Sequence, residues 1–146
     1  MQKPQSNNTT FLTLKNLALQ PSDILISSFQ PSDTQLLFDD DLEFAIFSIL
    51  LKKALDGNIG ATSALLADQT SKTKNTVNVR LERLYYKRLI SKREIGNALL
   101  YFFPIQTILY NTLETIAISE TKELILNHIK NYINYAKEGI KTLKAL

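Results

Sequence analysis

Residues 70–90 (TSKTKNTVNVRLERLYYKRLI) combine apolar side chains at helical spacing with a strongly basic composition. Apolar residues recur at i, i+4 and i+7, which predicts a helix over about residues 74–88 with one buried face. The members of that face are Val77, Leu81 and Leu84. Thr73 is a suitable N-cap, because its hydroxyl can accept a hydrogen bond from the first turn. The segment has a single acid, Glu82, and the bases Lys72, Lys74, Arg80, Arg83, Lys87 and Arg88. We therefore expect a helix that is fixed to a core on one side and cationic on the others.

Two further helices are predicted before this one. Residues 41–56 have acids at the start, lysines near the end and then Gly57, which can adopt the left-handed conformation of a helix cap. The segment is apolar on most sides, so it should lie at the centre of the core. A short helix is predicted over residues 64–70, with Thr62 or Ser63 as its cap.

A β-hairpin is predicted directly after the basic helix. Gly96-Asn97 separates two segments rich in apolar residues, as the turn of a tight hairpin does. The hairpin should span residues 91–103 and end at Pro104. The chain is thus expected to be mainly α-helical with one small β-hairpin.

The last part of the chain is predicted to form two helices, Gln106–Ile118 and Glu120–Leu143, with Ser119 as the cap of the second. Apolar residues of the second helix repeat at spacings of three and four, close to the heptad pattern of associating helices. This seam consists of Ile125, Ile129, Tyr132, Ala136, Ile140 and Leu143. We expect it to join two copies of the chain.

Charge is distributed unevenly along the sequence. Residues 1–56 hold four lysines and seven acids, a net charge of −3. Residues 57–110 hold eight Lys or Arg and three acids, a net charge of +5, and residues 111–146 are at +1. A polyanion would therefore bind the middle segment.

Several classes of protein are not expected. The sequence has no cysteine, no signal peptide and no apolar run long enough to span a membrane, so we expect a cytoplasmic protein without membrane contact. His128 is the single histidine and has no acid nearby to orient it, so no enzyme is expected. The Asp triplet 39–41 is interpreted as helix capping, so neither a metal nor a cofactor is expected.

The order of a helix, a short helix, a turn, a basic helix and a hairpin resembles the winged helix-turn-helix regulators, such as the MarR and penicillinase-repressor families. The resemblance covers residues 42–104. The matching residues are Leu66, Ala67, Thr76, Val77, Leu81, Arg83, Leu84, Lys87, Leu89 and Ile90, with Tyr101, Phe102 and Phe103 where the second wing strand ends. Arg88 departs from the pattern, since these families often have Gly there, and Thr70 and Lys72 stand where apolar residues usually pack.

The resemblance implies a homodimeric DNA-binding protein, in most cases a transcription regulator such as a repressor. The expected organisation is a flexible arm, an N-terminal extension, a winged helix-turn-helix and a helical dimerisation segment, at residues 1–10, 11–40, 41–104 and 105–146. These families often sense a small molecule between their helices, so an effector is possible, but no residue of this sequence indicates one. A role in plasmid or viral partition or replication is an alternative, as is a winged helix used as a protein-interaction module.

Eleven residues are expected to contact DNA. Base edges in the major groove should be read from the helix start by Lys74, Asn75 and Asn78. Phosphates should be bound by Thr73 and Thr76 with the helix N-terminus, and by Arg80, Arg83, Lys87, Lys92 and Arg93. Asn97 at the tip of the hairpin should reach the neighbouring minor groove or its phosphates. Two alternatives remain open: Arg80 could pair with an acid of the first helix or near Glu82, and Arg83 could pair on the Asp68 side of the short helix.

Overall fold

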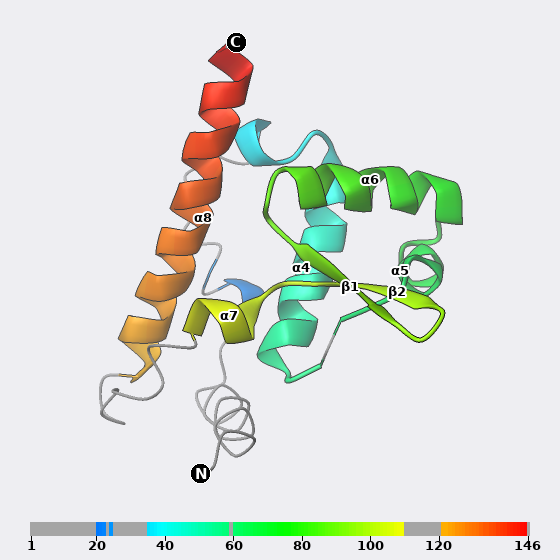
Figure 1. Cartoon of the computed structure of the whole chain (residues 1–146), viewed down its shortest axis with the longest axis horizontal. Coiled ribbons are helices and arrows are strands. Elements are labelled where there is room, and N and C mark those ends of the chain that lie inside the picture. Colours follow the sequence, from blue (N-terminus) through cyan, green and yellow to red (C-terminus); the bar gives the residue numbers. More distant parts are fainter. Residues whose placement is uncertain (1–19, 23, 25–34, 59, 110–120, 146) are drawn as a thin grey trace.

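The computed structural model describes residues 20–22, 24, 35–58, 60–109 and 121–145. Over these residues the protein is mainly helical with one two-stranded antiparallel hairpin, as predicted (Figure 1). The elements are α4 (Asp41–Leu55), α5 (Ser63–Thr70), α6 (Lys74–Tyr86), β1 (Ser91–Ile95), β2 (Ala98–Phe102), α7 (Ile105–Leu109) and α8 (Thr121–Ala145). In the part of the chain so described, every helix is too short or too polar to cross a membrane.

Helix α4 forms the centre of the core because it is apolar on most sides. Phe47, Leu50 and Leu51 are fully buried, and the Phe47 ring meets that of Phe103 edge to face at a centroid distance of 5.8 Å. Asp40 is the N-cap, and its carboxylate accepts the Glu43 N–H at 2.9 Å, which confirms the capping interpretation of the Asp triplet for this residue. The predicted left-handed cap is also present, since Gly57 has φ 87°.

Part of the predicted N-terminal extension belongs to the same core. Ile24 and Leu37 are fully buried and Phe38 is 4% exposed. The Phe38 ring lies 5.3 Å from that of Phe47 on α4. The predicted arm over residues 1–10 lies outside the described residues, as does most of the predicted helix between Gln106 and Ile118 and its neighbour Ser119.

Helices α5 and α6 are joined by a three-residue turn that begins at Ser71, which has φ 58°. Thr62 caps α5 and Thr73 caps α6, each hydroxyl accepting an N–H three residues later at 3.2 Å. The predicted buried face of α6 is confirmed, since all three of its residues are 0% exposed: Val77, Leu81 and Leu84.

Helix α6 ends at Tyr86, two residues before the predicted end. Arg88 adopts φ 65°, the left-handed conformation usual for glycine at the end of a helix. The Leu89 N–H then donates to the Leu84 carbonyl at 3.1 Å, and the Arg88 N–H to that of Tyr85 at 2.9 Å. This pair of hydrogen bonds closes the helix as a Schellman motif, with Arg where Gly is common.

The hairpin is fixed to α6 and to the segment before α5. Its register runs from Ser91↔Phe102 to Ile95↔Ala98, with Gly96 at φ +61° in the turn. The backbone of Tyr101 exchanges two hydrogen bonds of 2.9 Å with that of Ala61. The Tyr101 hydroxyl donates to the Glu82 carboxylate on α6 at 2.6 Å. The hairpin therefore has a fixed position relative to α6.

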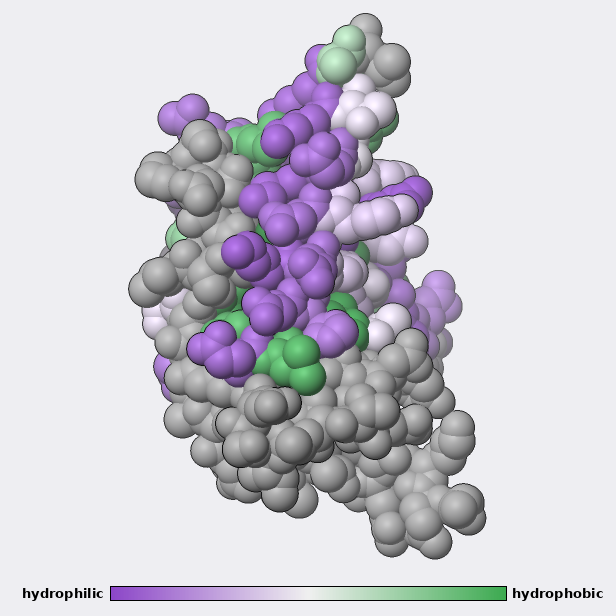
Figure 2. All heavy atoms as spheres, turned by 90° about the vertical axis from the view of Figure 1, so that its left-hand side faces the viewer, coloured by the Kyte–Doolittle hydropathy of each residue, from purple (hydrophilic) through white to green (hydrophobic). Residues whose placement is uncertain are grey.

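Helix α8 packs its apolar face against its own chain, which corrects the predicted dimer seam. Of that seam, Ile125, Ile129, Ala136 and Ile140 are at most 5% exposed, so they are not available to a second copy. Ile133, which the heptad interpretation left out, is also fully buried. The opposite side of α8 is hydrophilic, as Figure 2 shows.

Candidate nucleic-acid interface

The start of α6 carries the polar side chains that were predicted to read bases. Lys74 and Asn75 are exposed and Asn78 is half-buried. Among the described residues, none of these three side chains has a hydrogen-bond or ion-pair partner. Figure 1 places this end of α6 and the hairpin turn on one side of the fold and α8 on the other. The predicted base-reading residues are therefore accessible, and Asn97 is exposed at the tip of the hairpin.

Two threonine hydroxyls lie beside them. The Thr73 hydroxyl accepts the Thr76 N–H at 3.2 Å, and the two hydroxyls share a hydrogen bond of 2.8 Å. Each hydroxyl has one hydrogen and the shared bond uses only one of them, so one remains to donate outward. The first N–H groups of a helix also lack partners within it. This end of α6 can therefore donate several hydrogen bonds to an anion.

The cations further along α6 are bound to acids of the protein itself. Arg80 donates from Nε and Nη2 to Asp40 Oδ2 at 2.9 and 2.7 Å. These hydrogen bonds lower the pKa of the Asp40 carboxyl below its usual value. The alternative pairing of Arg80 with an acid of the first helix is thus confirmed, and the acid is its N-cap.

Lys87 lies deeper in the same contact between α6 and α4. Its ammonium donates to Glu43 Oε1 at 2.6 Å, to Asp39 Oδ1 at 3.0 Å and to the Leu37 carbonyl at 2.9 Å. The hydrogen bond from Lys87 is the largest cause of a lowered pKa of the Asp39 carboxyl. Only 15% of the Lys87 side chain is exposed, so it is poorly placed to reach a phosphate.

Arg83 is turned toward the same acids but keeps contact with solvent. Its Nη1 lies 3.7 Å from both Asp39 Oδ2 and Glu43 Oε2, and 45% of its side chain is exposed. The alternative that paired Arg83 with the Asp68 side of α5 is wrong, because the acids that it faces are Asp39, just before α4, and Glu43 in α4. We call Asp39, Asp40 and Glu43 the acidic cluster; it faces three cations that were expected to bind phosphate.

Of the two cations of the hairpin, Lys92 is paired with an acid of the protein and Arg93 is not. The Lys92 ammonium pairs with both carboxylate oxygens of Glu82 at 3.1 Å and lies 4.3 Å from the centre of the Tyr85 ring. The Tyr101 hydroxyl and then Lys92 lower the pKa of Glu82, which keeps this pair charged. Arg93 is exposed, and its guanidinium lies 5.6 Å from the Phe102 ring with no ion pair to any described residue.

Two candidate residues were missed from the sequence. Lys72 precedes α6, is exposed and has no ion-pair partner in the described ranges. Val79 lies on the outward side of α6 with 46% of its surface exposed. The sequence could have indicated both residues. Lys72 lies next to the cap residue Thr73, and a helical wheel places Val79 opposite the buried face, one turn after Asn75.

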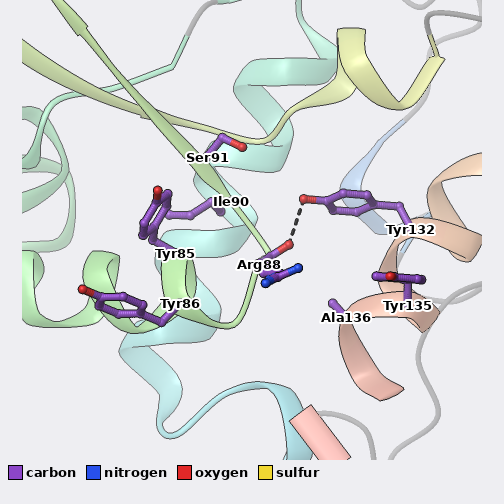
Figure 3. A pocket seen from close by; sticks show the side chains of 8 residues that line it. All are labelled: Tyr85, Tyr86, Arg88, Ile90, Ser91, Tyr132, Tyr135 and Ala136. Atoms are coloured by element: carbon purple, nitrogen blue, oxygen red, sulfur yellow. Dashed lines mark hydrogen bonds between the residues drawn. The ribbon is translucent and has the colours of Figure 1, made fainter. Parts of the chain in front are cut away.

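A pocket of about 670 Å³ lies at the other end of α6, against α8 (Figure 3). Its walls include Tyr85, Tyr86, Arg88, Ile90, Ser91, Tyr132, Tyr135 and Ala136. The Tyr132 hydroxyl donates to the Arg88 carbonyl at 2.8 Å, and burial raises the pKa of Tyr132 to about 12. None of the pocket's lining residues belongs to the predicted DNA-contacting set, so the pocket is a separate feature of the molecule.

No known protein family, curated protein or solved structure matches this chain.

Proposed function

We propose that the protein binds double-stranded DNA in a sequence-specific manner, as a winged helix-turn-helix regulator of transcription. Helix α6 would enter the major groove and the hairpin β1–β2 would act as the wing. The observation that carries the proposal is the group of accessible side chains at the start of α6, Lys74, Asn75 and Asn78, on a helix whose apolar face is fully buried. Asn can form two hydrogen bonds with adenine, and Lys can reach the acceptors of guanine.

The ion pairs of α6 indicate how the helix would lie. Arg80 and Lys87 are held by the acidic cluster, so the second half of α6 offers few free cations. The first half offers Lys74, the free hydroxyl hydrogen of the threonine pair and the helix N-terminus, which suit a phosphate. We therefore propose that α6 enters the groove with its first two turns leading, as recognition helices commonly do.

The proposal includes a second copy, because one such helix reads few base pairs and two related by a twofold axis read a palindrome. The buried members of the α8 seam cannot supply the contact. One seam residue, Leu143, is 64% exposed, and two aromatic side chains outside the seam are also exposed: Tyr135 at 76% and Tyr86, at the end of α6, at 73%. We assign the contact between copies to this surface.

Selection of bound fragments from random duplex DNA, with the mass of the complex measured, tests the proposal. A palindrome bound by two copies is expected, whereas tandem repeats bound by many copies would indicate a partition or replication role. No enrichment of any sequence would contradict specific DNA binding.

Removing the base-reading side chains should abolish specific binding. In the triple variant Lys74→Ala, Asn75→Ala, Asn78→Ala we expect the affinity for the selected duplex to fall by more than about 100-fold, because each good base contact contributes about 1–3 kcal/mol. A control on α8, Asn127→Ala with Lys130→Ala, removes the same residue types at exposed positions outside the surface assigned to the contact between copies. Fluorescence anisotropy should show little change for that control. Equal losses in both variants would move the binding surface away from α6.

The salt dependence of binding should report how many cations reach phosphates. If only Lys72, Lys74 and Arg93 do so, the slope of log K against log salt is about −2.7 per protomer, at about −0.9 for each phosphate. Lys74 together with the five cations that the sequence assigned to phosphates would give about −5.4. Titrations between low and physiological salt distinguish these values, and the steeper slope would show that DNA opens the ion pairs with the acidic cluster.

Freeing Arg80 should steepen that slope by about 1. Asp40→Asn achieves this, because Asn retains the N-cap hydrogen bond and removes the carboxylate charge. The control is Asp56→Asn, which breaks the Lys52–Asp56 pair of 2.8 Å at the other end of α4 and changes the net charge equally. We expect tighter binding at low salt for Asp40→Asn only; equal gains would indicate a long-range charge effect.

One observation favours a second function, that of a protein-interaction module. The outward side of α6 is less cationic than its sequence suggested, and it exposes Val79 and Tyr86. An apolar protein surface could bind there. The selection experiment separates the two functions, since an interaction module would not enrich a DNA sequence.

A further inference from the structure

The outward side of α6 has an apolar side chain among its polar ones. Val79 is 46% exposed, although the buried face of the same helix is complete without it. It follows Asn75 by four residues, so the two side chains lie one turn apart on the same face. Valine is a poor choice for an exposed helical position, because its branched Cβ loses rotamer freedom there. The position therefore carries a cost in helix propensity that no contact with the described core offsets.

Val79 faces outward at this turn, because the charged side chains near it are bound to other parts of the protein. Glu82, three residues later, is drawn toward the hairpin by the Tyr101 hydroxyl at 2.6 Å and by Lys92 at 3.1 Å. Arg80 is drawn the other way, to Asp40 at 2.7 Å. Charged side chains on either side are thus turned away from Val79. A ligand that approaches this face of the helix meets Asn75 first and a small apolar surface one turn later.

Only one base presents an apolar group in the major groove, namely thymine, with its C5-methyl. One helical turn advances about 5.4 Å, which is between one and two base-pair steps of about 3.4 Å. A valine one turn after a base-reading Asn is therefore placed to touch a neighbouring base pair. We propose that Val79 contacts the C5-methyl of a thymine next to the adenine bound by Asn75 or Asn78, which makes it a specificity-determining residue. This inference rests on the proposed DNA binding by α6.

The test replaces each thymine of the selected duplex, one at a time, by 2′-deoxyuridine, which removes only the C5-methyl. We expect one thymine in each half-site at which replacement weakens binding by about 3- to 5-fold, as burial of one methyl group predicts. Replacement at the other thymines should have no effect, so they serve as internal controls. Val79→Ala should bind the thymine and deoxyuridine duplexes equally, and Val79→Ile should retain the preference for thymine.

The outcomes separate this inference from the proposed function. Val79→Ala should fold normally, because Ala favours a helix and the side chain is not in the core; urea denaturation checks this. If the wild-type chain enriches a sequence but no thymine is sensitive to its methyl, the inference is wrong and DNA binding stands. The same holds if Val79→Ala keeps the full sensitivity. If no sequence is enriched, both are wrong.

Discussion

Gly60→Ala is expected to destabilise the fold by about 4 kcal/mol, from backbone strain of about 1–3 kcal/mol and overpacking of a similar size. Gly60 has φ +128°, a conformation that side chains rarely adopt. An added Cβ would lie 2.3 Å from the Tyr101 carbonyl oxygen and 2.8 Å from the Phe102 Cβ. Tyr101 cannot move aside, because its backbone is paired with Ala61 through two hydrogen bonds and its hydroxyl holds Glu82. A domain of this size has a total stability of about 5–15 kcal/mol, so Gly60→Ala should remove roughly a quarter or more of it.

Two other glycines provide controls for this result. Gly96 has φ +61° but open space around it, so Gly96→Ala should cost only the strain, about 1 kcal/mol. Gly139 lies in α8 with nothing within 4 Å of an added Cβ, so Gly139→Ala should stabilise the helix by up to about 1 kcal/mol. Urea denaturation of the three variants gives the comparison. Similar losses for Gly60→Ala and Gly96→Ala would show that the close approach to β2 carries no cost.

Glu43→Ala should lower the free energy of unfolding by about 3 kcal/mol, because breaking a buried ion pair leaves a charge without its partner. Glu43 is 0% exposed and accepts from Lys87 at 2.6 Å and from the Asp39 N–H at 3.2 Å. The loss stays at the lower end of the expected range, because Lys87 keeps Asp39 and the Leu37 carbonyl. Denaturant unfolding measures the change.

A double variant and a surface variant test the cause. Glu43→Leu with Lys87→Met removes both charges and should recover most of the loss, since apolar residues often replace a buried ion pair without cost. Glu138→Ala removes an exposed Glu whose pair with Lys141 measures 3.5 Å, and it should cost less than about 0.5 kcal/mol. A double variant as unstable as Glu43→Ala would mean that packing around Glu43, and not charge, is what the substitution disturbs.

The elements of the fold could be predicted from local signals. The spacing of Val77, Leu81 and Leu84, the caps at Asp40 and Thr73, and the Gly96-Asn97 turn each depend on residues close in sequence. Helix α6 was predicted two residues too long because nothing in its periodicity shows that Arg88 takes the left-handed cap position.

The partners of the basic side chains could not be predicted in the same way. Arg80 meets Asp40 across forty residues of sequence and Lys87 meets Glu43 across forty-four, so no local pattern connects them. The signal available for these ion pairs was the uneven charge, which is negative over residues 1–56 and positive after them. This distribution fits attraction between the two segments as well as attraction of a polyanion. The seam of α8 was ambiguous for a related reason. The same spacing of apolar residues suits packing within one chain and association between two copies of the chain.

The acidic cluster has a consequence for the search for a target site. Non-specific affinity for nucleic acid comes almost entirely from cations that displace counterions, whereas discrimination comes from contacts with base edges. Because Arg80 and Lys87 are already paired within the molecule, the second half of α6 would add little to adhesion on random sequence. Under the proposed function, such a protein would dissociate quickly from the many incorrect sites of a genome, and its occupancy would depend on the few bases that it reads.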